Sequence, residues 1–242
     1  MIVEVCANSL ESAVNAQKAG ADRIELCAEL AVGGVTPSFG MLKMIKEYIS
    51  IPVNVLIRPR SGDFTYTDLE FEVMKNDVAI CSELGFNGVV SGLLKKDFSL
   101  DVERTKELIA LSSPMDFTFH RAFDWVREPF VVLSQLEDLG VDTILSSGQE
   151  QSSPHGLSLL YQLLQKSDRC TIMPGGGIRD TNVLQFKEKG FGAVHLSGIQ
   201  FSKTLDHTPK VPMNTANFLK EDEVGVSSIN TIREVVRIVK EN

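Results

Sequence analysis

Two short segments of the chain repeat one arrangement of a glutamate and a cysteine. "IVEVC" places Glu4 two residues before Cys6, and "RIELC" places Glu25 two residues before Cys27. Residues two apart in a β-strand share a face, so neighbouring strands about 4.8 Å apart can bring the two pairs together. Carboxylates placed in this way can act as general acids and bases. The alternative for the thiols is that they are small buried apolar groups, a common fate of free cysteines.

Charged and polar residues also stand at the ends of other β-type segments. "NVLIRPR" carries Arg58, "FTFHRAFD" carries His120 and Arg121, and "AVHLSG" carries His195 and Ser197. An unpaired charge is strongly disfavoured in a core, so this collection indicates a polar cavity. The structural alternative is that the two glutamates form ion pairs with Arg58 or Arg121, while the histidines are hydrogen-bonded inside the core.

A glycine run forms a third candidate site. "MPGGGIRD" contains Gly175, Gly176 and Gly177 before a predicted helix, and "LSG" adds Ser197 and Gly198. Backbone N–H groups left free before a helix can bind an anion, and (β/α)8 barrels often bind phosphate through the loops after strands seven and eight. The alternative is that the glycines only make a tight turn.

The elements that must position these residues alternate along the whole chain. β-branched and helical patterns predict strands over 2–6, 23–27, 53–58, 88–91, 116–120, 143–146, 171–174 and 193–197. Helices are predicted over 10–19, 39–48, 67–84, 101–111, 130–139, 156–165, 182–189 and 228–240. Eight strands alternating with eight helices favour a single α/β domain over 1–242, a (β/α)8 TIM barrel with its chemistry at the carboxyl ends of the strands. We expect one long loop, over 203–226, which is either a lid or an oligomer contact because loops of this length seldom stay free in a compact domain. Its apolar residues, expected to make the oligomer contact, are Val211, Met213, Phe218 and Leu219.

Composition excludes several classes of function. The formal charge of -8 argues against a nucleic-acid partner, because binding phosphate backbones needs a basic face. No apolar run approaches the roughly 20 residues of a membrane span, and no secretory signal is visible at the N-terminus. Four dispersed cysteines do not resemble a disulfide framework. We therefore expect a soluble cytoplasmic protein with reduced thiols and no membrane partner.

The quoted segments, with "MIVEVCANSLESAVNAQKAGADRIELCAEL", "IRPRSGDFTYTDLEFEVMKNDV" and "LSSG", together resemble the CutC family over about residues 1–202. The resemblance implies a cytoplasmic (β/α)8 barrel that forms a homodimer or a higher homo-oligomer. It also implies Cu(I) binding through Cys6 and Cys27, in agreement with the preference of Cu(I) for thiolates. Nearby arginines would favour the thiolates, whereas Glu4 and Glu25 would oppose them. No CxxC, methionine-rich stretch or histidine pair supports a dedicated copper carrier, and no organic cofactor is indicated.

Two hypotheses of function remain open. In the first, the barrel binds Cu(I) and acts in copper tolerance. In the second, the barrel mouth is the active site of an enzyme for a small anionic, phosphorylated metabolite. The glycine run would then hold the anion, Arg58 and Arg121 would clamp a second charge, and Glu4, Glu25 or His120 would act as general acid or base. No lysine stands at a strand end, which disfavours a Schiff-base aldolase.

Overall fold

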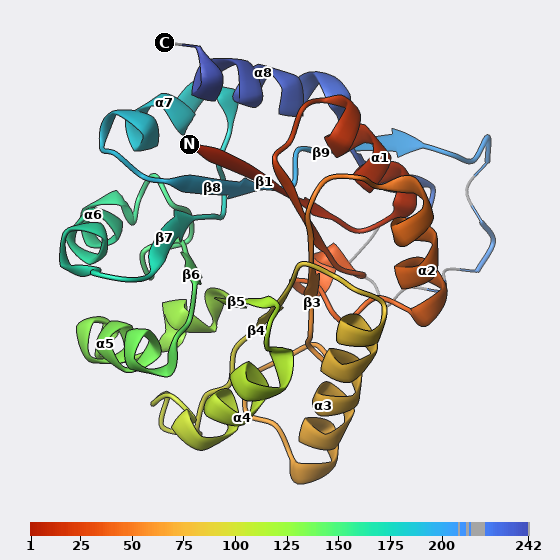
Figure 1. The fold of residues 1–242 in the computed structure, drawn as a ribbon. Helices are drawn as coiled ribbons and strands as arrows, with labels where there is room; N and C mark the ends of the chain where they lie inside the picture. Colours follow the sequence, from red (N-terminus) through yellow and green to blue (C-terminus); the bar gives the residue numbers. More distant parts are fainter. Residues whose placement is uncertain (208, 212, 214–220, 242) are drawn as a thin grey trace.

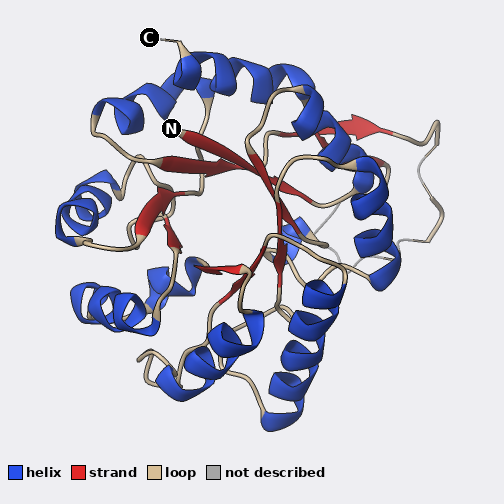
Figure 2. Ribbon diagram, viewed as in Figure 1, coloured by secondary structure: helices blue, strands red, loops and turns tan. Residues whose placement is uncertain are grey.

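Eight parallel strands of the computed structural model form a nearly closed barrel, which confirms the predicted fold (Figures 1 and 2). The structure describes residues 1–207, 209–211, 213 and 221–241. The strands are β1 (Ile2–Ala7), β2 (Arg23–Leu26), β3 (Val53–Leu56), β4 (Gly88–Ser91), β5 (Asp116–Phe119), β6 (Thr143–Ser146), β7 (Thr171–Pro174) and β8 (Ala193–Leu196). They pair in sequence order from β1 to β7, and β8 pairs with β1.

Helices surround the strands on the outside of the barrel, as Figure 2 shows. They are α1 (Leu10–Lys18), α2 (Phe39–Tyr48), α3 (Asp68–Glu83), α4 (Val102–Ser112), α5 (Pro129–Leu139), α6 (Leu157–Lys166), α7 (Asp180–Glu188) and α8 (Ile229–Lys240). Hydroxyl side chains begin several of them, for example Ser9 before α1 and Thr67 before α3, and thereby satisfy N–H groups that the helix leaves free. No helix of the described part is both long and apolar enough to cross a bilayer.

The register of β1 and β2 does not place glutamate opposite glutamate and cysteine opposite cysteine. Cys6 lies opposite Glu25, and Glu4 lies opposite Arg23. On its other side β1 pairs with β8, where Glu4 lies opposite His195. Because alternate residues of a strand face opposite sides, these side chains share the barrel interior. The first and last strands of the barrel therefore bring residues 4 and 195 together.

The long loop predicted over 203–226 is wrong in part, because its ends belong to a β-hairpin. Strands β9 (Ile199–Lys203) and β10 (Glu223–Ser227) pair antiparallel outside the barrel. The "EVGVS" segment has β-branched residues at alternate positions, a strand pattern that the loop assignment overlooked. Of the apolar residues expected to make an oligomer contact here, Val211 and Met213 are exposed. Phe218 and Leu219 lie outside the described residues.

Candidate functional site

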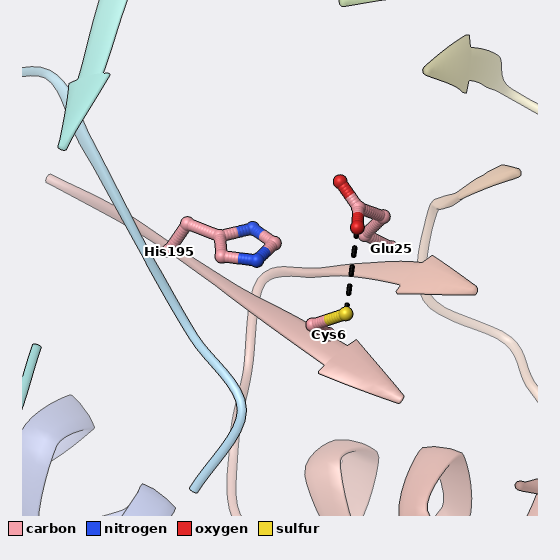
Figure 3. A group of neighbouring side chains, drawn as sticks. All are labelled: Cys6, Glu25 and His195. Atoms are coloured by element: carbon pink, nitrogen blue, oxygen red, sulfur yellow. Dashed lines mark hydrogen bonds between the residues drawn. The ribbon is translucent and has the colours of Figure 1, made fainter. Parts of the chain in front are cut away.

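Three potential ligand side chains meet at the carboxyl ends of three adjacent strands. Cys6 comes from β1, Glu25 from β2 and His195 from β8, and Figure 3 shows them converging. The Cys6 thiol donates to Glu25 Oε1 over 3.4 Å. One ligand atom from each of the three residues lies within 4.8 Å of the other two. This arrangement can hold a metal ion or move a proton.

His195 is oriented by Glu4, which is held in turn by Arg23. Glu4 is fully buried and accepts a hydrogen bond from Arg23 Nε at 2.5 Å. Its other oxygen lies 2.8 Å from His195 Nδ1. Burial alone would raise the pKa of Glu4, but the His195 and Arg23 contacts outweigh it and lower that pKa. An ionised Glu4 accepts the Nδ1 proton, so in the neutral ring the free lone pair is on Nε2.

The two cysteines of the repeated segments are neighbours, although only one of them faces the mouth. Cys6 Sγ and Cys27 Sγ are 3.5 Å apart, well beyond the roughly 2.05 Å of a disulfide bond. The contact with Cys27, burial and the carboxylate of Glu25 all raise the pKa of Cys6 well above its usual value. Cys27 is fully buried behind Cys6. Cys6 is therefore a thiol in the metal-free protein, and it forms no disulfide with Cys27.

A cavity of about 400 Å³ lies over this cluster at the mouth of the barrel. Its walls come from several strand ends and from the loops that follow β7 and β8. The polar side chains and glycines in its lining are Cys6, Glu25, Gly33, Arg58, His120, Arg121, Gly176, Gly177, Arg179, His195, Ser197, Gly198 and Thr231. The cavity thus combines acids, bases and cationic groups at the end of the barrel where (β/α)8 enzymes place their chemistry.

Arg58 does not pair with a glutamate, contrary to the structural alternative considered from the sequence. Its Nη1 donates to the carbonyl oxygens of Val32 and Gly34, at 2.9 and 2.8 Å, and its Nη2 donates to Gly62. The guanidinium also lies 5.1 Å from the centre of the Phe64 ring. The buried Nε has no hydrogen-bond partner among the described residues. Arg58 therefore lines the cavity while it holds the loops that follow β2 and β3 together.

His120 is held as a neutral imidazole. Its Nδ1 accepts from the Ala122 N–H at 3.1 Å, which leaves the ring proton on Nε2. Burial and the charge of Arg58 lower the pKa of His120 to about 3. The Nε2 atom has no partner in the described part of the chain. His120 is thus suited to donate a hydrogen bond, whereas a role as general base near neutral pH does not fit this environment.

Arg121 belongs to a network with Asp124 rather than with the two glutamates. Its Nε donates to Asp124 at 2.7 Å, and its Nη2 donates to the Ser147 hydroxyl at 2.8 Å. Asp124 in turn accepts from the Ser146 hydroxyl and the Ser147 N–H. This network fixes the guanidinium at the cavity wall, next to the glycine run, where a Cβ on Gly176 would lie 3.2 Å from Arg121 Nη1.

The glycine run divides into two parts with different tasks. Gly175 pairs with His195 and closes the seam between β7 and β8, and a Cβ there would lie 2.4 Å from a Leu145 methyl group. Gly176 and Gly177 have φ angles of +94° and +80° and line the cavity together with Ser197 and Gly198. In the described part of the chain the N–H groups of Gly176 and Gly177 have no hydrogen-bond partner. They remain candidates for anion binding.

Most of the predicted site residues line one cavity, and three of them do not. Cys27, Glu4 and Gly175 do not line it. Arg23 was not among the sequence candidates, and the signal that could have found it is its place two residues before Glu25 on the same strand. His195 was named at a strand end, with a hydrogen-bonded core histidine as the alternative, but it was assigned no role in a site.

A family model described as the CutC family matches residues 1–200. The chain belongs to the CutC family. A CutC protein of Photorhabdus laumondii is 51% identical over 221 residues, covering 90% of this chain and 89% of the relative. A CutC protein of Salmonella agona is 46% identical over 196 residues, covering 81% of this chain and 79% of the relative.

Solved structures agree with this membership and with the barrel. A crystal structure from Streptococcus agalactiae, provisionally described as a copper homeostasis protein CutC, has a TM-score of 0.78 and 32% sequence identity. The match covers 81% of this chain and 98% of that one. A thiamine phosphate pyrophosphorylase from Pyrococcus furiosus has a TM-score of 0.59 at 13% identity, covering 99% of this chain and 95% of that chain. The second likeness shows the fold alone.

Proposed function

We propose that this chain binds Cu(I) at the base of the barrel mouth, with Cys6 and Cys27 as ligands. The observation that supports this most directly is the 3.5 Å separation of their sulfur atoms, which come from two neighbouring strands. Soft thiolates select Cu(I) over harder ions. The relative from Streptococcus agalactiae is described as a copper homeostasis protein, and a barrel that holds Cu(I) in the same way would serve that purpose here.

The surroundings of the thiols determine how the ion would bind. Metal binding requires thiolates, so each thiol that becomes a ligand releases a proton. The contact with Cys27, burial and the carboxylate of Glu25 all hold the pKa of Cys6 high. Two thiolates and one Cu(I) ion together carry one negative charge more than two thiols, so an ionised Glu25 would oppose the loaded site. Burial, its largest influence, raises the pKa of Glu25, so this carboxyl would take up a proton more readily when Cu(I) binds.

The test is a competition titration of Cu(I) between the protein and a chromophoric chelator under anaerobic, reducing conditions. Cys6→Ser and Cys27→Ser are each expected to lose the affinity of the wild-type chain for Cu(I). Cys81→Ser is the matched control, because Cys81 is equally buried but lies on α3, away from the mouth. Unchanged affinity in the Cys6→Ser, Cys27→Ser double variant would refute the proposal.

A second function, an enzyme for a small anionic metabolite, is favoured by the size of the cavity. Its volume of about 400 Å³ lies in the range of small-molecule sites, roughly 300–1,000 Å³, and is far more than a metal ion needs. Gly176, Gly177 and Ser197 would hold the anionic group, with Arg121 beside them. Glu25 would be the acid or base, since burial, its largest influence, raises its pKa toward the range useful for proton transfer. Glu4 would act only through His195.

This second function is tested by thermal unfolding in the presence of inorganic phosphate and small sugar phosphates. A ligand at 100 times its dissociation constant stabilises the folded state by about 2.7 kcal/mol. Arg121→Met is expected to abolish the shift. Arg60→Met is the control, because Arg60 forms ion pairs with Asp63 and Glu70 and does not line the cavity. Equal stabilisation of both variants would contradict a phosphate site in the mouth.

A further inference from the structure

The three converging side chains offer three different ligand atoms. Cys6 supplies sulfur, Glu25 oxygen and His195 nitrogen, from β1, β2 and β8. Cu(I) prefers soft sulfur ligands, whereas the borderline ion Zn²⁺ accepts sulfur, imidazole nitrogen and carboxylate oxygen together. Three protein ligands are also the number found in catalytic zinc sites. The donor set therefore fits an ion other than Cu(I).

The carboxylate of Glu25 is left incompletely paired in the interior. The residue is only 5% exposed, and its Oε2 has no hydrogen-bond partner among the described residues. Its Oε1 accepts only from the Cys6 thiol, which is a weak donor. A buried carboxylate oxygen without a donor is costly. A cation bound between Glu25, Cys6 and His195 would remove that cost, which is independent support for a ligand at this position.

His195 is already oriented as a metal ion requires. Glu4 lies 2.8 Å from Nδ1, and Arg23 fixes Glu4 from the other side, so Nε2 is the ring atom left for a metal ion. Burial lowers the pKa of His195, but Glu25 and Glu4 outweigh it and raise that pKa, so a metal ion would displace a proton from the charged ring. A carboxylate behind a ligating histidine is the usual outer shell of a protein metal site. Glu4 and Arg23 would therefore be positioning residues.

We propose that Cys6, Glu25 and His195 form a three-ligand Zn²⁺ site whose fourth coordination position opens into the mouth cavity. All three residues line that cavity, whereas Cys27 and Glu4 do not. With bonds of about 2.0–2.3 Å, neighbouring ligands of a tetrahedral ion lie roughly 3.3–3.8 Å apart. The three ligand atoms already lie within 4.8 Å of one another, and Cys6 Sγ and Glu25 Oε1 are 3.4 Å apart, so small side-chain movements would bring them to these separations.

The ligand of the open position follows from the remaining walls of the cavity. Arg121 and the free N–H groups of Gly176 and Gly177 face the same space. They suit an anionic oxygen group, and an oxyanion is also a suitable fourth ligand for Zn²⁺. The site would take a small organic anion that binds the ion through oxygen. This ion site shares Cys6 with the Cu(I) site but does not use Cys27, and Cu(I) binding does not use His195, so substitutions of Cys27 and His195 test the two proposals separately.

Cobalt substitution tests the site directly. Co²⁺ added to the reduced, metal-free protein is expected to give the intense d–d bands of a four-coordinate ion and a thiolate-to-cobalt charge-transfer band. Zn²⁺ is expected to displace it. Glu25→Gln and His195→Asn are each expected to weaken Co²⁺ binding by more than about 100-fold, beyond the roughly 10–100-fold of a lost outer-shell partner. Inorganic phosphate is expected to change the d–d bands of the wild-type complex.

The same variants separate this proposal from the Cu(I) proposal. Cys27→Ser is expected to lose Cu(I) binding and to retain the cobalt spectrum. His195→Asn is expected to lose the cobalt spectrum and to retain Cu(I). Thermal unfolding of each variant checks its folding, and Glu25→Gln replaces His195→Asn if the latter does not fold. A cobalt spectrum that survives both substitutions, or that lacks the charge-transfer band, would overturn the zinc site whatever the result with Cu(I).

Discussion

Replacing Glu25 by glutamine is expected to stabilise the metal-free protein at pH 8. The carboxylate is 5% exposed, its Oε2 has no partner in the described part of the chain, and its Oε1 accepts only from the Cys6 thiol at 3.4 Å. Burial, the largest influence, raises the pKa of Glu25. The ionised carboxylate of Glu25 is therefore unfavourable in the folded state, and a neutral amide of nearly the same shape removes this free-energy cost. Residues kept for a ligand often stabilise a protein when they are replaced.

The size of the effect follows from the contacts that Glu25 lacks. An unsatisfied buried polar group costs about 1–3 kcal/mol, and a charged one costs more. The amide of glutamine also lacks a full set of partners, so we expect a gain of about 1–2 kcal/mol in the free energy of unfolding. In a chain of this size that gain corresponds to a rise in Tm of roughly 2–8 °C.

A matched control is provided by Glu137, which is also buried but has several hydrogen-bond donors on its Oε1. Its Oε1 accepts from the Ser167 hydroxyl and from the N–H groups of residues 168–170, at 2.9–3.2 Å. Burial opposes its ionisation, but the hydrogen bonds from those N–H groups outweigh it and lower the pKa of Glu137. Glu137→Gln is therefore expected to lower Tm by several degrees, because hydrogen bonds to a charged acceptor are stronger by about 1 kcal/mol or more.

The two variants should also differ in their dependence on pH. A raised carboxyl pKa means that the stability contribution of Glu25 is present below the usual value of 4.5 and is lost as pH rises through the folded-state pKa. The advantage of Glu25→Gln therefore grows from pH 5 to pH 8. A lowered pKa has the opposite sign, so the contribution of Glu137 is present above 4.5 and is lost as pH falls through the folded-state pKa.

Urea unfolding followed by circular dichroism at pH 5, 6.5 and 8 measures these differences. The expected result is a gain in the free energy of unfolding for Glu25→Gln that increases with pH, together with a loss for Glu137→Gln at pH 8. A loss of several kcal/mol or so for Glu25→Gln at pH 8 would refute it, because a structural ion pair breaks with a cost of that size. Glu25 would then be a structural residue and not part of a ligand site.

Three further results are expected. The affinity of the wild-type chain for Cu(I) should rise with pH. The contact with Cys27, burial and Glu25 raise the pKa of Cys6, and binding releases the proton of that thiol. A pH-independent affinity in a competition titration from pH 6 to 9 would contradict this. Glu4→Gln should weaken Co²⁺ binding by roughly 10–100-fold without abolishing the charge-transfer band, and loss of the band itself would place Glu4 among the ligands. Light scattering at micromolar concentration should show a homodimer or a higher homo-oligomer, because the exposed Val211 and Met213 lie in a segment expected to make that contact, and a clean monomer would exclude it.

The sequence by itself determined the fold and the end of the barrel at which the chemistry lies. Strand and helix patterns depend on neighbouring residues, so a period of two or 3.6 can be recognised before any tertiary contact is known. For this reason the predicted strands 88–91, 143–146 and 171–174 agree with β4, β6 and β7 to the residue. The hairpin of β9 and β10 was missed because its two strands are separated by a long segment of the sequence, so that no local turn signals their pairing.

The side of a strand on which a residue lies could also be predicted, and the partner of that residue could not. The two-residue spacing placed Glu4 with Cys6 and Glu25 with Cys27. Only the register between β1 and β2 decided that Cys6 lies opposite Glu25. A shift of one strand by two residues would preserve every pattern in the sequence and change every cross-strand neighbour.

Closure of the barrel decided the rest of the site. His195 reaches Glu4 because β8 pairs with β1, across 191 positions of the sequence. Arg58 was available to pair with either glutamate, but the loop carbonyls of Val32, Gly34 and Gly62 take its guanidinium instead. Such contacts depend on where loops pack in space and leave no periodic signal in the sequence. The sequence thus shows which residue types could bind a ligand, while the way the barrel closes decides which of these residues meet at one site.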